Sequence, residues 1–367
     1  MKYINELSSI LSASTFQNKA HATLLAQLMV AFCAVRTVNL KQVANAIHGM
    51  ATVESKYRRL QRFFESANIC FDSVARLIAR IFFSDTAQWR LTMDRTNWQF
   101  GRIDINILML GICYKNRALP ICWTLLGKKG NSNTEERIRL FSRFIKLFGT
   151  PRIKVLLADR EFVGGDWFKW LREQGIPFNI RIKQDAITTN SRGLEVDIDG
   201  LFFHLNPGEK QVLSGPRQLW KVSVYLAGKR LPNGELLIVA TSEPWPDSIN
   251  MYCYRWEIET LFECLKGRGF NLETTRLTNP ERLNKLIAAL ALTYCWAHKT
   301  GEWRCEQGDG IKVKTHGRLS RSLFRHGLDL LQQIVFGVCS NTKIIKKCFR
   351  LMKPRSLPSK KLGLFIC

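Results

Sequence analysis

The sequence lacks the paired cysteines and clustered histidines that mark zinc and disulfide proteins. Its 11 cysteines are odd in number and never form a C-x-x-C pair, and its 6 histidines are dispersed. Most cysteines lie in apolar segments such as "AFCAV" and "LTYCWA", which is typical of small core residues in a reducing compartment. We therefore expect neither a disulfide framework nor a zinc site.

Long hydrophobic runs are also missing. The longest, "LIAALALTYCW" and "LLAQLMVAFCAV", are too short to span a bilayer, and no signal peptide opens the chain. These features predict a soluble cytoplasmic protein without a membrane partner.

Acidic residues are scarce relative to basic ones. The chain of 367 residues has 55 Lys and Arg against 30 Asp and Glu, a formal net charge of +25. Such a surplus favours a polyanionic partner, because cations that neutralise phosphates release the counterions of DNA. Nucleic acid is a better candidate than a lipid surface, and the length allows two or three domains.

Residues 1–85 predict a helical N-terminal domain that binds DNA. "LKQVANAI" and "TVESKYRRLQRFFES" read as two short helices separated by "HGMA", which contains Gly49, and Thr52 is the expected N-cap of the second. A basic second helix after a glycine-bearing turn resembles a helix-turn-helix, although a simple helical bundle gives the same pattern. The predicted DNA-binding cations of this helix are Lys56, Arg58, Arg59 and Arg62.

Residues 86–300 predict an α/β domain with a mixed sheet. Three strand-like runs starting at Trp89 are joined by short breaks and are expected to be antiparallel. A helix ending at Gly149, a buried strand "RIKVLLA", a short helix and the strand "PFNIRIK" follow, so the last two strands should be parallel. Residues 186–245 hold short strands with hairpin signals and predict an all-β insertion.

The C-terminal part, residues 301–367, predicts a helical region with a basic tail. From Lys343 to Lys361 the chain contains eight Lys or Arg and no acid, interrupted by Pro354 and Pro358. This composition predicts a loosely ordered basic arm.

Two aspartates occur where buried strands rarely carry charge. Asp94 lies on the first strand of the antiparallel trio, and Asp159 ends the first parallel strand. For each alone a turn residue is the favoured interpretation, but these strands should be neighbours, so the two carboxylates should converge. Glu259, on the helix after the β insertion, would add a third. Clustered carboxylates need a cation, and Mg²⁺ prefers oxygen ligands. Two such ions about 3.5–4 Å apart support in-line phosphodiester attack.

The segment "YCYRWEIETLFECLKGRGF" carries acids and bases on one predicted helix face. At 100° per residue, a polar stripe contains Tyr252, Arg255, Glu259, Glu263 and Lys266. The opposite, core-facing strip contains Tyr254, Ile258, Leu261 and Leu265. Ion pairs on a solvated helix are the simpler interpretation of the stripe; a glutamate metal ligand beside phosphate-binding cations is the other.

The spacing Tyr252-x2-Arg255-x3-Glu259-x6-Lys266 resembles the YREK signature of bacterial DDE transposases, in the group named for insertion sequence four. The resemblance covers roughly residues 85–300 and implies an RNase H-like core with a β insertion. It implies that Asp94, Asp159 and Glu259 are the catalytic and metal-binding residues, and that Tyr252, Arg255 and Lys266 contact the backbone of the transposon end.

The same resemblance implies the activity and its setting. It implies cut-and-paste transposition, with cleavage at the transposon ends that depends on two Mg²⁺ ions, with Mn²⁺ as a substitute, and then attack of the freed 3′-OH on target DNA. Partners would be double-stranded DNA and a second copy of the chain in a synaptic homodimer, in the bacterial cytoplasm at the nucleoid.

Several alternatives stay open. Glu161 and Glu263 are acids close to two of the candidates, so either could replace its neighbour as a ligand. Trp220 and Trp245 are candidates for stacking on a flipped base, although packing is the more common role of such residues. A nuclease or resolvase on the same fold, or an inactive DNA-binding regulator, are the competing functions.

Overall fold

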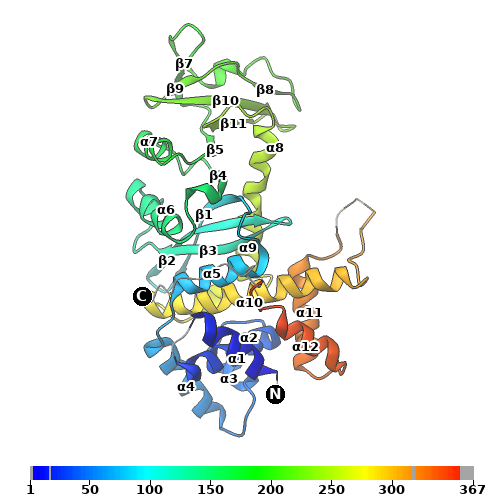
Figure 1. The fold of residues 1–367 in the computed structure, drawn as a ribbon. Coiled ribbons are helices and arrows are strands. Elements are labelled where there is room, and N and C mark those ends of the chain that lie inside the picture. Colours follow the sequence, from blue (N-terminus) through cyan, green and yellow to red (C-terminus); the bar gives the residue numbers. More distant parts are fainter. Residues whose placement is uncertain (1–2, 16–17, 316, 318, 356–367) are drawn as a thin grey trace. The chain divides into compact units, whose positions relative to one another are not determined.

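The computed structural model describes residues 3–15, 18–315, 317 and 319–355. The chain divides into two compact units (Figure 1). The helical unit contains the described residues of the ranges 1–36, 40–87 and 288–367, and the sheet unit contains residues 37–39 and 88–287. The predicted ranges 86–300 and 301–367 meet inside helix α10, Pro280–Glu306, which spans the division between the units.

The helical unit draws on the N-terminal and C-terminal parts of the chain, and the described residues before β1 (Trp89–Phe100) form helices in it. Its helices are α1 Ile4–Thr15, α2 Lys19–Val35, α3 Leu40–Ala46, α4 Val53–Ser66, α5 Phe71–Phe82, the later part of α10, α11 Leu323–Val335 and α12 Thr342–Arg350. Gly301 of α10 and Gly327 of α11 let these helices touch, because a Cβ added at either position would lie within 2 Å of backbone oxygen of the other helix.

Within the described residues, no single helix is long and apolar enough to cross a membrane. Helices α2 and α3 pass the length and composition test only as a pair bent by 102°. Most residues of α2, from Ala22 to Ala34, are buried in the protein.

The predicted basic arm is wrong over its first residues. Helix α12 begins right after Asn341, whose side chain accepts hydrogen bonds from the N–H groups of Lys343 and Ile344. Cys348 and Phe349 of α12 are buried, and the Cys348 carbonyl accepts a bond from the Trp296 indole at 2.9 Å. This packing orders residues up to Arg350 despite their charge; positions 356–361 of the arm lie outside the described residues.

The sheet unit has the predicted order of strands and helices. Its first elements are β1 Trp89–Phe100, β2 Ile103–Tyr114, β3 Arg117–Leu125, α6 Thr134–Phe148, a 3₁₀ turn at Thr150–Arg152, β4 Ile153–Ala158, α7 Gly165–Glu173 and β5 Phe178–Ile182. β1, β2 and β3 pair antiparallel, whereas β4 is parallel to β1 and to β5. Asn133 and Glu136 form a capping box that starts α6. The mixed α/β sheet is therefore confirmed.

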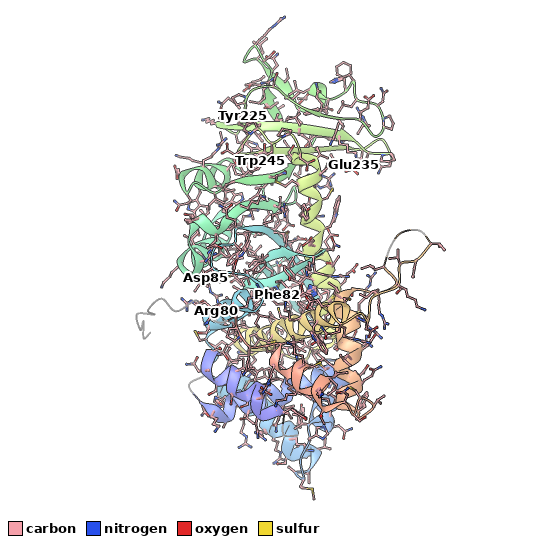
Figure 2. The ribbon with its side chains drawn as sticks, turned by 45° about the vertical axis from the view of Figure 1, so that its right-hand side comes forward. Arg80, Phe82, Asp85, Tyr225, Glu235 and Trp245 are labelled. Atoms are coloured by element: carbon pink, nitrogen blue, oxygen red, sulfur yellow. The ribbon has the colours of Figure 1, made fainter. Side chains whose placement is uncertain are left out.

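The β segment after β5 extends this sheet. Its elements are β6 Ile187–Thr189, β7 Glu195–Asp197, a 3₁₀ turn at Asp199–Leu201, β8 Lys210–Val212, β9 Arg217–Leu219, β10 Val222–Arg230 and β11 Leu236–Thr241. The sheet runs β3-β2-β1-β4-β5-β11-β10-β8, β9 pairs with β10 beside this path, and β6 and β7 form a separate pair. Tyr225 of β10 faces Thr241 of β11 in the register, and Glu235 forms an ion pair with Arg181 of β5 (Figure 2). The predicted insertion is thus continuous with the sheet.

A helical run returns the chain along the sheet after β11. It consists of α8 Ser248–Tyr252, the 3₁₀ turn η3 Cys253–Trp256 and α9 Glu257–Leu265, and a short 3₁₀ turn at Leu272–Thr274 precedes α10. Figure 1 shows α6 and α7 on one side of the sheet and α8 and α9 on the other.

Candidate functional site

Strand pairing brings the two aspartates side by side. Met93 of β1 is in register with Ala158 of β4, so Asp94 and Asp159 are the next residues of two parallel neighbours. Each Oδ1 accepts a hydrogen bond from the following backbone N–H, at 2.7 Å from Arg95 and 2.8 Å from Arg160. Asp94 lies inside a long strand, whereas Asp159 begins a turn directly after β4.

The helical run supplies the other members, although not as one regular helix. Since η3 is wound as a 3₁₀ turn, residues before and after it do not follow a uniform 100° spacing. Ile258, Leu261 and Leu265 are buried as the core-facing strip predicts, but Tyr254 is 38% exposed. Tyr252 and Arg255, expected on the polar stripe, are only 1% and 4% exposed.

Arg255 lies between the carboxylates. Its Nη2 donates to Glu259 Oε1 at 2.5 Å, and its Nη1 lies 3.6 Å from Asp94 Oδ2. Tyr252 donates its hydroxyl to Asp159 Oδ1 at 3.2 Å. Thr92 of β1 donates to the Arg255 carbonyl at 3.3 Å, which ties η3 to the sheet. Thus the Tyr and Arg of the predicted motif each hold a predicted catalytic acid.

The electrostatics of the cluster favour a cation. Burial raises the pKa of Asp94 to about 7; the Arg95 N–H and Arg255 oppose the shift, while Glu161 and Glu259 add to it. Burial lowers the pKa of Arg255, but Tyr252, Glu259 and Asp159 outweigh this and raise it. All three predicted acids therefore act on the same guanidinium.

The donor set suits a hard divalent cation. Asp94, Asp159 and Glu259 offer carboxylate oxygens, the ligands that Mg²⁺ prefers. Within the described residues, no three His, Cys, Asp or Glu side chains are close enough together to ligate one metal ion. Asp94 and Glu259 pair with Arg255 instead, and Asp159 accepts a hydrogen bond from Tyr252. Glu259, whose side chain is 49% exposed, has the most room to turn. The residue types fit; ligation requires the acids to exchange Arg255 and Tyr252 for the metal.

Glu161 and Glu263, the acids close in sequence to Asp159 and Glu259, each pair with another arginine. The turn after β4 separates Glu161 from Asp159, and Arg95 pairs with Glu161 through Nε and Nη2 at 3.3 and 3.2 Å. Glu263 pairs with Arg268 at 2.7 Å. Both alternatives to Asp159 and Glu259 thus have basic partners of their own.

Sequence reasoning missed the residues that position the site. Arg137 of α6, 4% exposed, donates to the carbonyl oxygens of Ser132, Glu161 and Val163 and so fixes the loop after Asp159. Glu257, at the start of α9, accepts a hydrogen bond from Tyr114 N at 2.8 Å and closes on the β2–β3 turn. No periodic or motif signal marks either residue, because each acts through backbone groups distant in sequence.

Two buried carboxyls predict how stability depends on pH. Burial raises the pKa of Glu257 to about 7, although hydrogen bonds from the N–H groups of Tyr114 and Asn116 lower it. Burial likewise raises the pKa of Asp94 to about 7. The folded chain therefore binds more protons than the unfolded chain between about pH 4 and 7, so the free energy of unfolding should fall as pH rises through this window. The slope is at most about 1.4 kcal/mol per pH unit for each group.

Urea unfolding in EDTA from pH 4.5 to 7.5 measures this slope. Glu257→Gln keeps an acceptor for the Tyr114 N–H and should flatten the slope, while Glu263→Gln serves as an exposed control that should leave it unchanged. A wild-type stability that rises with pH over this range would contradict the assignment.

The remaining predicted DNA-binding residues are Lys266 of the sheet unit and four cations of α4 in the helical unit. Lys266 follows α9, and its Nζ lies 2.7 Å from Glu273 Oε1, donates to the Asn97 carbonyl at 3.3 Å and lies 5.6 Å from the Trp98 ring centroid. Of the α4 cations, Arg58, Arg59 and Arg62 are exposed and Lys56 is half-buried. Thr52 caps α4 through the Ser55 N–H, as predicted, and Gly49 has the positive φ of 125°.

The two tryptophans proposed for base stacking both lie between Asp159 and Glu259 in the sequence. Trp220, 37% exposed, packs edge-on against Phe168 at 5.4 Å. Trp245 is half-buried after β11 (Figure 2). Trp256, 44% exposed, lies nearer to the acids, with its ring 5.4 Å from the Arg255 guanidinium carbon.

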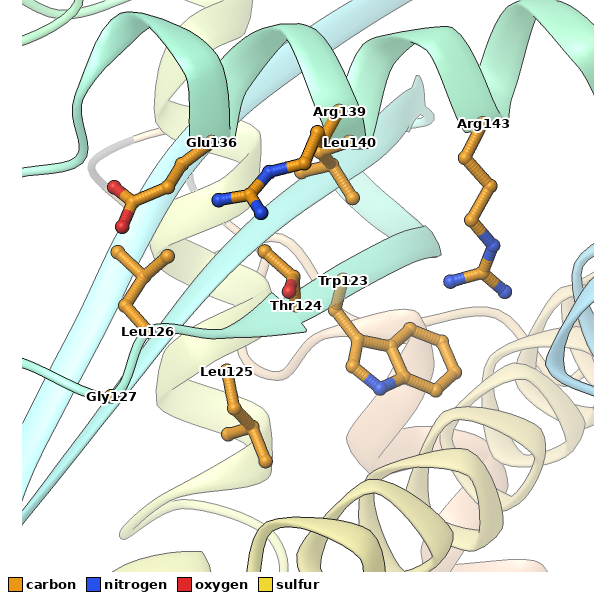
Figure 3. Close-up of a pocket in the computed structure, with 9 residues that line it drawn as sticks. All are labelled: Trp123, Thr124, Leu125, Leu126, Gly127, Glu136, Arg139, Leu140 and Arg143. Carbon is orange, nitrogen blue, oxygen red and sulfur yellow. The ribbon is translucent and has the colours of Figure 1, made fainter.

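A separate cavity of about 340 Å³ lies between α6 and the edge strand β3 (Figure 3). Arg139 and Arg143 project from α6 toward Trp123 and Thr124 of β3. Glu136, also on its wall, is held by Lys128 at 3.0 Å and by the capping box. None of the three predicted catalytic acids lines this cavity.

Comparison with known proteins places this geometry in a family. The family model described as "Transposase DDE domain" matches residues 85–296. No curated protein matches the chain. Among solved structures, the chain is similar to the piggyBac transposase in a cryo-EM structure of its synaptic complex with hairpin DNA. The identity is 12%, the coverage 98% of this chain and 84% of that chain, and the TM-score 0.45.

Proposed function

The chain belongs to the transposase DDE domain family, and from this premise we propose that it cleaves DNA at transposon ends and joins the freed 3′-OH to target DNA. The observation that carries the proposal is the adjacency of Asp94 and Asp159 on two parallel strands, with Arg255 pairing Asp94 to Glu259 and Tyr252 holding Asp159. Within this family, we propose that the chain is a bacterial transposase of the group named for insertion sequence four, acting by cut-and-paste. The strand order 3-2-1-4-5, with the first three strands antiparallel, supports an RNase H-like core.

The chain's acids would hold two Mg²⁺ ions, with Mn²⁺ as a substitute. The ions would supply an activated water and stabilise the leaving oxygen. Asp94, Asp159 and Glu259 are the proposed ligands, and burial of Asp94 keeps its carboxyl poised to lose a proton near neutral pH as a cation binds.

The motif residues would serve both the acids and the DNA. Tyr252 and Arg255, which hold carboxylates here, would meet phosphates of the transposon end by exchanging partners. Lys266, with 22% of its side chain exposed, would likewise exchange its ion pair with Glu273 for a DNA phosphate. In the helical unit, Lys56, Arg58, Arg59 and Arg62 of α4 would contact duplex DNA, and a homodimer at the nucleoid would bring two ends together.

Binding to duplex DNA should be strongly salt-dependent. If six to ten phosphates are contacted, affinity should fall by about 10³–10⁵ between 50 and 200 mM salt, because each contact releases condensed counterions. Fluorescence anisotropy of a labelled duplex at several salt concentrations measures the slope. An affinity almost independent of salt would point away from nucleic acid.

Cleavage and joining need separate readouts. DNA carrying the inverted repeats that flank the reading frame should be nicked at the repeat ends when Mg²⁺ is present, and joined products should appear when target plasmid is added. Cutting without joined products would favour a nuclease or resolvase, and binding without cutting would favour a regulator.

A further inference from the structure

The segment between α10 and α11 forms a narrow β-hairpin, here called the hairpin arm and comprising the described residues of 311–321. Val313 and Leu319 form an antiparallel bridge, Ser320 N donates to the Lys312 carbonyl at 2.8 Å, and Gly317 N donates to the Lys314 carbonyl at 2.9 Å. Figure 1 shows this ribbon standing away from α10 and α11. The proposed function assigns it no role.

The base of the hairpin arm is fixed by buried and charged contacts. Arg304 of α10 donates from Nε to Asp309 at 2.8 Å and from Nη1 to the His326 carbonyl at 2.8 Å. His326 of α11, fully buried, has its Nε2 2.8 Å from the Asp309 carbonyl oxygen. On the other leg, Arg321 pairs with Asp329 at 3.4 Å. The ribbon is therefore held at a defined place relative to both helices.

The charge of the hairpin arm is of one sign. The sequence from Ile311 to Arg321 contains four Lys or Arg and no acid. Lys312 and Lys314 are exposed, and no ion pair joins either to another residue in the part of the chain that the structure describes. Lysines on an unpaired ribbon also discourage edge-to-edge aggregation, so charge alone does not identify a partner.

The hairpin arm also carries an exposed apolar pair, which protection of a strand edge against aggregation does not explain. Val313 is 63% exposed and Leu319 50% exposed, and they face each other across the ribbon. Lys312 and Lys314 are exposed on either side of Val313 in the sequence. Apolar side chains between cations match the major groove, where thymine methyl groups lie between two walls of phosphates. The groove, about 12 Å wide, admits a two-stranded ribbon.

We propose that the hairpin arm binds in the major groove of duplex DNA, with Lys312 and Lys314 on phosphates and Val313 and Leu319 against base edges. The contact rests on the proposed function, because it presumes a DNA substrate, but it involves none of the catalytic acids. It would give the helical unit a second reading element besides α4.

The test measures binding of the full chain to a labelled duplex by anisotropy across a salt series. Lys312→Gln/Lys314→Gln should reduce the slope of log affinity against log salt by about 1.8, since each lost phosphate contact removes about 0.9. The matched control, Lys154→Gln/Lys169→Gln, removes the same charge from two exposed positions of the sheet unit and should leave the slope close to wild type.

Val313→Ser/Leu319→Ser should weaken binding about tenfold with an unchanged slope, because it removes base contacts and no charge. If the lysine variant has the same salt slope as its control, the proposed phosphate contacts are overturned. If the apolar variant binds like wild type, the proposed base contacts are overturned. Both results together overturn DNA binding by the hairpin arm, while the proposed function stands. A wild-type chain that binds no duplex at all overturns both.

Discussion

Asp94→Asn is expected to lower the rate of DNA cleavage by about 10³-fold or more while DNA affinity changes less than about threefold. The substitution keeps the shape of the side chain but removes the negative charge that a divalent cation needs. Because burial already raises the pKa of Asp94 to about 7, a neutral amide is not expected to destabilise the fold. Asp159→Asn and Glu259→Gln should give the same loss. Cleavage of end-containing DNA in Mg²⁺, with binding measured in parallel, checks all three.

Two matched variants separate the metal ligands from their neighbours. Glu161→Gln and Glu263→Gln each remove an acid that lies close in sequence to a proposed ligand but pairs with Arg95 or Arg268. Both should retain cleavage within about tenfold of wild type. Normal cutting by Asp159→Asn together with inactivity of Glu161→Gln would transfer the ligand role to Glu161.

The strands of the site were predictable because their signals are local. The β1 and β4 segments are apolar runs bounded by breaks, and the short links between β1, β2 and β3 fix their antiparallel order. Because β4 follows a helix it is expected to run parallel to β3 and β1, and its observed pairing with β1 places Asp159 beside Asp94. Chain connectivity thus predicts the direction of β4, whereas the choice of β1 over the edge strand β3 as its neighbour is seen only in the structure.

The surroundings of Tyr252 and Arg255 were not predictable in the same way. A regular helical wheel puts both on a polar stripe, and polar stripes normally face solvent. Here Tyr252 and Arg255 face the sheet, where Asp94 and Asp159 offer partners for buried polar groups, whereas Glu263 of the same stripe is exposed. Which face of an amphipathic helix is buried depends on acids more than 90 residues away, and the periodicity of the segment carries no information on them.

The division into units shows the same limit. The predicted boundary near residue 300 follows the end of an apolar helix in the sequence, but α10 continues as one helix to Glu306 while its contacts change unit after Ile287. The β segment likewise has the short strands of an insertion, yet the pairing of β11 with β5 makes it part of the sheet. Local patterns define elements, whereas pairing partners define domains.

Arg255→Met is expected to lower the free energy of unfolding by about 1.4 kcal/mol at pH 8, since it leaves the buried Asp94 carboxyl, whose pKa is about 7, without its cation and obliges it to take up a proton. The loss should shrink toward pH 5, because Asp94 then takes up a proton and needs no partner. Urea unfolding in EDTA at both pH values measures the difference. The double variant Arg255→Met/Asp94→Asn should recover most of the loss at pH 8, since it removes both charges. Equal losses at the two pH values, with no recovery in the double variant, would mean that Arg255 stabilises the fold through its packing on Tyr252 and Trp256 rather than through Asp94.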